Sequence, residues 1–198
     1  MTKETDITDY YNNNAVDYCK RTLKIDLQSI YPEFLQHLKI NNKILDAGCG
    51  SGRDSKFFQQ LSYDITAMDA SKELVLLSSK LIGKPTLHLS FDEMTFENEF
   101  DGIWACASLL HVSNLQMNTI LEKFVRALKT RGIWFMSFKY GTEEIFYNNI
   151  LYNYQNENSL SRYLANFHNL KTVKMWKHHS CDSSNCQVDW LCCIVQKI

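Results

Sequence analysis

Two carboxylates and three glycines flank the first buried segment of the chain and form its most informative group of residues. Asp46 precedes a loop containing Gly48, Gly50 and Gly52, and Asp69 ends the next apolar segment. Glycines let a backbone pass close to a ligand. A carboxylate at the end of the second strand of a doubly wound sheet commonly accepts hydrogen bonds from ribose hydroxyls. The spacing therefore predicts a site for a ligand that contains a nucleoside.

The residues around the loop discriminate between nucleoside ligands. A Walker-type phosphate loop ends in a Lys–Ser or Lys–Thr pair, which is absent, and a nicotinamide-binding loop would have a third glycine where Arg53 stands. Asp46 would repel a pyrophosphate but suits the sulfonium and ammonium groups of S-adenosylmethionine. The loop thus favours S-adenosylmethionine, and a tight turn without a ligand is the alternative.

The composition predicts a single globular domain. The chain has 198 residues, of which 45% are hydrophobic and 22% charged, and its net charge of −1 does not favour a nucleic-acid or membrane partner. The amino terminus is polar, and no apolar run approaches the roughly 20 residues of a membrane helix. We therefore expect a cytoplasmic protein whose seven scattered cysteines are reduced.

Strands and helices are expected to alternate along most of the chain. Apolar periodicity predicts helices over 27–40, 54–61, 71–82 (with Ser71 as N-cap), 114–129 and 159–167. Strands are expected over 43–48, 64–70, 86–91, 100–107 and 131–140, and 170–179 and 187–198 could pair as an antiparallel hairpin across "SCDSSN". This alternation predicts a parallel sheet covered on both faces, the α/β class.

Four segments in this order resemble the motifs of a known family: "ILDAGCGSGRDS", "ITAMDAS", "FDEMTF" and "FDGIWACASLLHV". They are similar to class I S-adenosylmethionine-dependent methyltransferases, especially the small bacterial tellurite-resistance type. The resemblance implies a doubly wound, Rossmann-like seven-stranded sheet, mostly parallel with an antiparallel last strand. It also implies one methyltransferase domain over 1–198, with a helical cofactor lid (1–40), a cofactor-binding core (41–140), and an acceptor-side segment with a C-terminal β-hairpin (141–198).

The resemblance implies a role for each matching residue. The three loop glycines would line the methionine part of the cofactor, Asp69 its ribose, and Phe91 and Asp92 the adenine edge. From the lid, Arg21 would pair with the cofactor carboxylate and Tyr18 would cover it, although the lid tyrosines could simply pack on the sheet. The complete set of expected cofactor-binding residues is Tyr18, Arg21, Asp46, Gly48, Gly50, Gly52, Arg53, Asp69, Ala70, Phe91, Asp92, Ala105 and Cys106.

Methyl transfer from a sulfonium depends mainly on alignment, so few catalytic groups are required. His111 is the candidate general base, because an imidazole titrates near neutral pH, and a histidine hydrogen-bonded at the start of a helix is the alternative. Lys139 and Tyr140, at the end of a strand, are candidate acceptor-side residues. The spacing of His178, His179, Cys181 and Cys186 matches no zinc pattern, so we expect no metal.

Three functions are compatible with these patterns. The first is methyl transfer to a small-molecule acceptor, and the second is a non-catalytic module that binds the cofactor. The third, an RNA or protein methyltransferase, is disfavoured because the chain has neither a basic balance nor an aromatic–basic alternation. The Tyr- and Asn-rich segment 141–169 is expected to shape the acceptor pocket but contains no motif that identifies the acceptor, and nothing predicts the oligomeric state.

Overall fold

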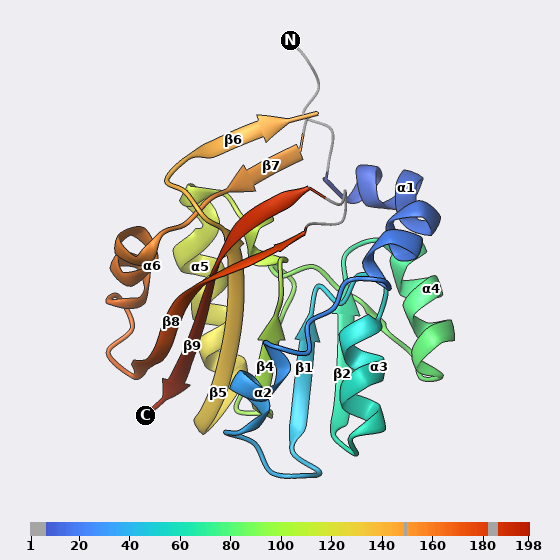
Figure 1. Cartoon of the computed structure of the whole chain (residues 1–198). Helices are drawn as coiled ribbons and strands as arrows, with labels where there is room; N and C mark the ends of the chain where they lie inside the picture. Colours follow the sequence, from blue (N-terminus) through green and yellow to red (C-terminus); the bar gives the residue numbers. More distant parts are fainter. Residues whose placement is uncertain (1–6, 149, 182–185) are drawn as a thin grey trace.

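The computed structural model describes residues 7–148, 150–181 and 186–198 and builds them around a twisted sheet (Figure 1). The sheet has seven strands in the order β3-β2-β1-β4-β5-β9-β8. Their bounds are β1 Lys43–Ala47, β2 Asp64–Asp69, β3 Leu87–His88, β4 Phe100–Ala105, β5 Leu128–Lys139, β8 Leu170–Cys181 and β9 Gln187–Lys197. The doubly wound α/β prediction is confirmed.

Strand directions agree with the sequence prediction. Strands β1 to β5 pair in parallel, whereas β9 is antiparallel to both β5 and β8. The predicted hairpin of the last two strands is therefore present, and most of its expected turn lies outside the described residues. In consequence the last strand of the chain lies inside the sheet, and β8 forms its edge.

The helices cover both faces of the sheet, as the alternation predicts (Figure 1). Ser71 caps α4 by accepting a hydrogen bond from the Leu74 amide, as expected. The helices are α1 Ile7–Thr22, α2 Tyr31–Leu35, α3 Arg53–Gln60, α4 Lys72–Ile82, α5 Asn114–Ala127 and α6 Glu157–Leu164. None of the described helices is long and apolar enough to span a membrane.

The inner part of strand β5 is apolar except for Ser137, because both of its faces are buried. Trp134, Met136 and Phe138 face the core cluster that includes α5 and α6, while Ile133 and Phe135 face the cluster that includes α2 and α3. All five side chains are buried. Because successive side chains of a strand point to opposite faces, a strand that is covered on both sides is apolar on both faces.

Two local predictions are wrong, and one element was missed. The helix expected over 27–40 is limited to Tyr31–Leu35, and the strand expected over 86–91 to Leu87–His88. The segment after β5 contains a two-stranded hairpin that was not predicted, β6 (Glu144–Tyr147) and β7 (Ile150–Asn153). Its buried Asn153 donates to the Val112 carbonyl and to Asn114, so these tertiary hydrogen bonds help to hold the hairpin in place.

The carboxyl ends of β1, β2, β4 and β5 meet at one edge of the sheet. From β1 the chain continues to β2 and β3 on one side, and from β4 it continues to β5 on the other. The topological switch point therefore lies between β1 and β4. Ligands of open α/β sheets bind in the crevice that forms at this point.

Candidate active site

Two adjoining cavities open at the switch point. One, of about 600 Å³, is lined by Asp69 and is called here the Asp69 cavity. The other, of about 150 Å³, is lined by Lys139 and is called the Lys139 cavity. Both share a set of lining residues that forms their junction: Tyr11, Tyr18, Gly48, Ala107 and His111. Two ligands bound in the two cavities would meet at this junction.

The glycine loop is required by the protein's own packing. Gly48 and Gly50 have φ values of 75° and 55°, a region that favours glycine. A Cβ on Gly48 would lie 2.7 Å from Cβ of Ser108, and a Cβ on Gly50 would lie 3.0 Å from the Tyr18 ring. The loop after β1 thus presses against the loop after β4 and against α1. Gly52, which packs on α4, lines neither cavity.

Asp69 combines a structural role with access to its cavity. Its carboxylate accepts from the Gly50 amide at 2.8 Å and from the Ser71 amide at 2.9 Å, which fixes the glycine loop to the start of α4. Burial raises the pKa of the Asp69 carboxyl. Each carboxylate oxygen can accept a second hydrogen bond, so Asp69 can still bind the hydroxyls of a ribose. Ala70, Phe91 and Asp92, which are expected to bind the cofactor, line the same cavity.

Asp46 does not occupy the position that the sequence suggested. It is 2% exposed, accepts from the Ser55 hydroxyl at 2.6 Å, and lines neither cavity. Burial, followed by the negative charge of Asp54, raises the pKa of the Asp46 carboxyl. The expectation that this carboxylate faces the sulfonium is therefore corrected: Asp46 holds the start of α3 from behind the loop.

The arginine of the site is Arg53 and not Arg21, which is exposed and lines neither cavity. Arg53 forms a bidentate pair with Asp54, with distances of 2.6 and 2.9 Å, and donates to the Thr22 carbonyl at the end of α1. Asp54 also accepts from Tyr31 at 2.6 Å and from the indole of Trp104 at 2.8 Å. This buried network ties α1, α3 and β4 together at one end of the Lys139 cavity.

The loop after β4 has an unusual backbone. Ala107 has a φ of 52°, and its amide donates to the Ser137 hydroxyl at 2.8 Å. A non-glycine residue in this conformation is uncommon and often occurs at functional sites. Cys106 lines the Lys139 cavity, where burial and the charge of Asp54 raise the pKa of its thiol to about 12. Ala105 is completely buried and lines neither cavity.

His111 lies at the junction with both ring nitrogens engaged. Nδ1 is 2.8 Å from the Leu151 carbonyl, and Nε2 is 2.8 Å from the Tyr11 hydroxyl. Because a carbonyl only accepts, Nδ1 carries the proton and Nε2 accepts from Tyr11. Burial lowers the pKa of His111 to about 4, so the ring is neutral at pH 7. The geometry is that of a satisfied histidine joining α1 to β7.

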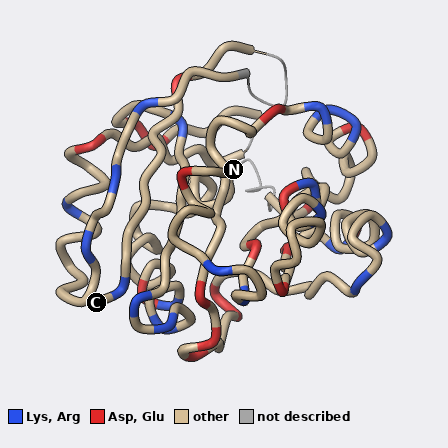
Figure 2. Tube along the Cα trace, turned by 60° about the horizontal axis from the view of Figure 1, so that its bottom comes forward, with Lys and Arg blue, Asp and Glu red and all other residues tan. Residues whose placement is uncertain are grey.

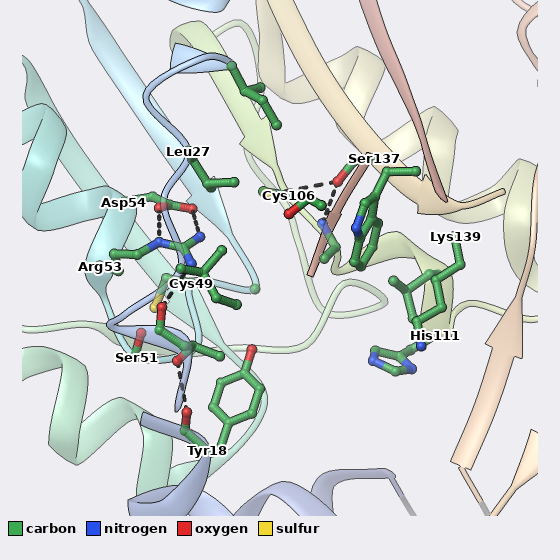
Figure 3. Close-up of a pocket in the computed structure, with 18 of the residues that line it drawn as sticks. Tyr18, Leu27, Cys49, Ser51, Arg53, Asp54, Cys106, His111, Ser137 and Lys139 are labelled. Atoms are coloured by element: carbon green, nitrogen blue, oxygen red, sulfur yellow. Dashed lines mark hydrogen bonds and ion pairs between the residues drawn. The ribbon is translucent and has the colours of Figure 1, made fainter. Parts of the chain in front are cut away.

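Lys139 and Tyr140, which are adjacent in sequence, have different environments. Lys139 Nζ lies 4.9 Å from the centre of the Tyr152 ring and lines the smaller cavity. Tyr140 lines neither cavity, and its hydroxyl donates to Glu157 at 2.8 Å. In Figure 3, His111 and Lys139 lie at the side of the cavity opposite Arg53 and Asp54.

Helix α1 covers both cavities and is docked by specific contacts. Tyr11 and Tyr18, from the segment expected to act as a lid, line both cavities. Asn12 Oδ1 accepts from the Ser71 hydroxyl at 2.8 Å and from the Glu73 amide at 3.3 Å, both at the start of α4. These contacts hold α1 over the glycine loop.

The structure thus brings together most of the predicted site residues and separates five of them. The predicted residues that line a cavity are Tyr18, Gly48, Gly50, Arg53, Asp69, Ala70, Phe91, Asp92, Cys106, His111 and Lys139. Those that line neither are Arg21, Asp46, Gly52, Ala105 and Tyr140. No group of three or more possible metal ligands occurs among the described residues.

Sequence reasoning missed several lining residues. Ala107 and Ser108 could have been found from their place in the loop after β4, within the quoted segment "FDGIWACASLLHV". No local signal identified the others, because they come from distant elements: Ser137, Tyr152 and Trp190.

A doubly wound sheet with a ribose-type carboxylate beside the glycine turn at its switch point defines a nucleoside-binding α/β domain. Residues 44–132 match the family described as "Methyltransferase domain". Together with relatives and solved structures named as S-adenosylmethionine-dependent methyltransferases, this match confirms the resemblance drawn from the motifs: the chain is similar to class I S-adenosylmethionine-dependent methyltransferases.

Relatives of known name match part of the chain. It is 33% identical over 95 residues to the malonyl-[acyl-carrier protein] O-methyltransferase of Buchnera aphidicola, covering 47% of this chain and 38% of that protein. It is 30% identical over 79 residues to a Haemophilus influenzae protein named "Probable S-adenosyl-L-methionine-dependent methyltransferase TehB", covering 37% of this chain and 28% of that one. The chain thus spans less than half the length of either relative.

A solved structure matches nearly the whole chain. The 1,6-didemethyltoxoflavin-N1-methyltransferase of Burkholderia thailandensis, with bound 1,6-didemethyltoxoflavin and S-adenosylhomocysteine, superposes with a TM-score of 0.78. The two proteins are 20% identical, and the match covers 96% of this chain and 87% of the other. At this identity the likeness shows the fold.

Proposed function

We propose that this protein transfers the methyl group of S-adenosylmethionine to a small-molecule acceptor. The observation that carries the proposal is the pair of cavities that meet at Gly48, Ala107 and His111. A transferase of this kind must hold a nucleoside cofactor and an acceptor at the same time, with the reacting atoms in line. A module that only binds the cofactor would not need the second cavity.

The Asp69 cavity fits the cofactor in size and in chemistry. Its volume of about 600 Å³ falls within the range of roughly 300–1,000 Å³ that is usual for small-molecule sites. Ser108 Oγ, in the wall of this cavity, is buried and has no hydrogen-bond partner within the described part of the chain. Such a group favours a polar ligand, because an unpaired buried hydroxyl is costly.

The residues assigned to the cofactor bind and orient it. Asp69 would accept from the ribose hydroxyls, and Phe91 and Asp92 would flank the adenine. Arg53, also expected at the cofactor, lines the adjoining Lys139 cavity instead, where it pairs with Asp54 and donates to the Thr22 carbonyl. When bound, S-adenosylmethionine supplies a methyl group that is already activated by the sulfonium.

We assign His111 a positioning role in place of the expected role of general base. Its Nε2 lone pair is engaged by Tyr11, and its Nδ1 proton by the Leu151 carbonyl. The ring therefore fixes Tyr11 at the junction of the two cavities. In this role His111 shapes the approach of the acceptor without taking its proton.

The distribution of charge supports a small acceptor over a nucleic acid. Figure 2 shows acidic and basic residues interspersed along the trace. Lys174, on the outer strand β8, pairs with Glu33 at 2.8 Å, so part of the lysine row on this strand is already neutralised. With no described membrane helix, we keep the cytoplasm as the proposed location.

Calorimetry with the purified protein tests the proposal. S-adenosylmethionine and S-adenosylhomocysteine should bind, whereas ATP and NAD should not, because the loop has neither the Lys–Ser pair of a Walker-type loop nor, at Arg53, the third glycine of a nicotinamide-binding loop. A screen of small acceptors should then release S-adenosylhomocysteine. Failure of both sulfur nucleosides to bind at millimolar concentration would contradict the assignment.

A further inference from the structure

The hydroxyl of Ser108 stands where a serine usually caps a helix, but it makes no cap. Ser108 is the N-cap of the short 3₁₀-helix Leu109–His111, and its side chain forms no capping hydrogen bond. Ser71 and Ser113, the N-caps of α4 and α5, each accept from the amide three residues further on. Capping is the common reason for a serine at this position. The Ser108 hydroxyl is therefore free for a different partner.

Within the part of the chain that the structure describes, the Ser108 hydroxyl has no such partner. Ser108 is 8% exposed, and its Oγ is buried without a hydrogen bond. The loop that carries it is held in place, because the preceding Ala107 has a φ of 52° and donates its amide proton to Ser137 at 2.8 Å. A buried hydroxyl without a hydrogen bond costs free energy, and strained backbone gathers at ligand sites. Together these features point to a ligand that supplies the missing hydrogen bond.

Ser108 lies in the wall of the Asp69 cavity and does not line the Lys139 cavity. Its Oγ and the tip of the Phe91 ring each lie 3.4 Å from the position that a Cβ on Gly48 would take, so the two side chains meet at the glycine loop. The sulfur of the cofactor would lie at the junction, and the ribose hydroxyls at Asp69. The part of the cofactor beside Ser108 and Phe91 is then the adenine.

The groups on this wall match the chemistry of adenine. Val112 and Ile120 line the same cavity and give apolar surface for the faces of the ring. A carboxylate such as that of Asp92 only accepts hydrogen bonds, so it suits the exocyclic amine. The ring nitrogens of adenine only accept as well, and they need a donor. A serine hydroxyl can donate to one of them.

Resting on the proposed function, we propose that the Ser108 hydroxyl donates a hydrogen bond to a ring nitrogen of the bound adenine and helps to determine the specificity for the cofactor. A site built around a hydrogen bond rejects an analogue that lacks the matching group, because the buried partner is then left unpaired. Ala107, the neighbour of Ser108, lines both cavities. The same bond therefore orders the loop against which the acceptor would pack.

Analogues of S-adenosylhomocysteine test which atom of the base is recognised. The 1-deaza, 3-deaza and 7-deaza forms each replace one ring nitrogen by C–H and keep the shape of the base. Calorimetry on the wild type should show that one of them binds roughly five- to thirtyfold more weakly than S-adenosylhomocysteine, because the hydroxyl stays unpaired in that complex.

Substitution assigns this loss to Ser108. Ser108→Ala should weaken S-adenosylhomocysteine binding by a similar factor and should no longer distinguish it from that one analogue. Any losses with the other two analogues should be equal in the wild type and in Ser108→Ala, since the two changes then act independently. Ser161→Ala removes a hydroxyl from an exposed position of α6 and should behave as the wild type.

Thermal unfolding without ligand gives a second readout, which a structural role would move the other way. Removing a buried hydroxyl that has no partner should leave the Tm of Ser108→Ala unchanged or raise it, whereas removing a hydrogen-bonded one lowers it. We therefore expect a variant that is at least as stable as the wild type and binds the cofactor product less tightly.

The outcomes separate this proposal from the proposed function. Failure of the wild type to bind S-adenosylhomocysteine would overturn the proposed function itself. If the wild type binds it and Ser108→Ala binds it equally well, only the role of Ser108 is overturned. Additive losses with all three analogues would show that the hydroxyl does not touch the base. A lower Tm of ligand-free Ser108→Ala would show that the hydroxyl has a partner within the protein, which would also overturn the proposal.

Discussion

The two cavities are built in different ways, although they share a junction. The Asp69 cavity is formed largely by short segments that follow β1, β2, β3 and β4, each of which carries a recognisable motif. The Lys139 cavity draws on α1, the segment after it, β5, β7, β8 and β9, which lie far apart in the sequence. The first cavity is a property of strand ends, and the second is a property of the assembled fold.

This difference agrees with the chemistry that each cavity would perform. A cofactor site can use backbone groups and one carboxylate at fixed strand ends, and such a site can be retained while the rest of the chain varies. An acceptor site must match one molecule, so it is built from the elements that vary most between proteins of one fold. The comparison predicts that substitutions in the two cavities separate cofactor affinity from acceptor selectivity.

Asp69→Ala should have the largest effect and should act on the cofactor. Removing a charged acceptor costs about 1.5–3 kcal/mol, so the affinity for S-adenosylhomocysteine should fall roughly ten- to a hundredfold by calorimetry. Asp69→Asn keeps one acceptor and should lose less. Asp64→Ala, at the exposed opposite end of β2, is the control and should bind normally.

A second ligand identifies the hydroxyl involved in the Asp69 contact. The 2′-deoxy analogue of S-adenosylhomocysteine should bind the wild type poorly but should differ little from the normal ligand in Asp69→Ala. Additive losses would mean that Asp69 does not touch the 2′-hydroxyl.

His111→Asn tests the positioning role of His111 at the junction of the cavities through the pH dependence of the protein's stability. Burial lowers the pKa of His111 to about 4, whereas an unfolded histidine titrates near 6.5. Between these two pH values the unfolded chain therefore binds a proton at His111 that the folded chain does not. The contribution of His111 to the free energy of unfolding is lost as the pH falls from about 6.5 towards 4. The free energy of unfolding, measured with urea at several pH values, should fall less steeply towards low pH in His111→Asn than in the wild type. The difference in slope should be at most about 1.4 kcal/mol per pH unit.

The surface provides a control for the histidine experiment. His37 is exposed, so His37→Asn should follow the wild-type pH profile. If His111→Asn also followed that profile, His111 would titrate as freely in the folded protein as in the unfolded chain, and its positioning role would be lost.

Asn12→Ala should have the smallest effect and should act on the helix that covers both cavities. It removes the contacts of Asn12 with Ser71 and Glu73, at a net cost near 1 kcal/mol for neutral hydrogen bonds. Stopped-flow measurements should show S-adenosylhomocysteine leaving roughly three- to tenfold faster. Asn13→Ala alters the adjacent exposed side chain and is the control. An unchanged rate in Asn12→Ala would show that α1 does not retain the ligand.

The sequence by itself determined the sheet and the cofactor side of the site. Strands such as β5 are apolar on both faces, which required helices on either side of the sheet. The glycine loop followed by Asp69 located the switch point. These features are local: a strand, a turn and the next strand end suffice to specify them, so a linear pattern records them.

Only the tertiary structure decided which charged groups face the cavities. Asp46 and Asp69 follow the same pattern in the sequence, yet Ser55 and burial enclose the first while the second opens into its cavity. Lys139 and Tyr140 are neighbours, and one enters a cavity while the other binds Glu157. A side chain's partners depend on segments brought close by packing, such as the unpredicted β6–β7 hairpin, and no local spacing encodes them.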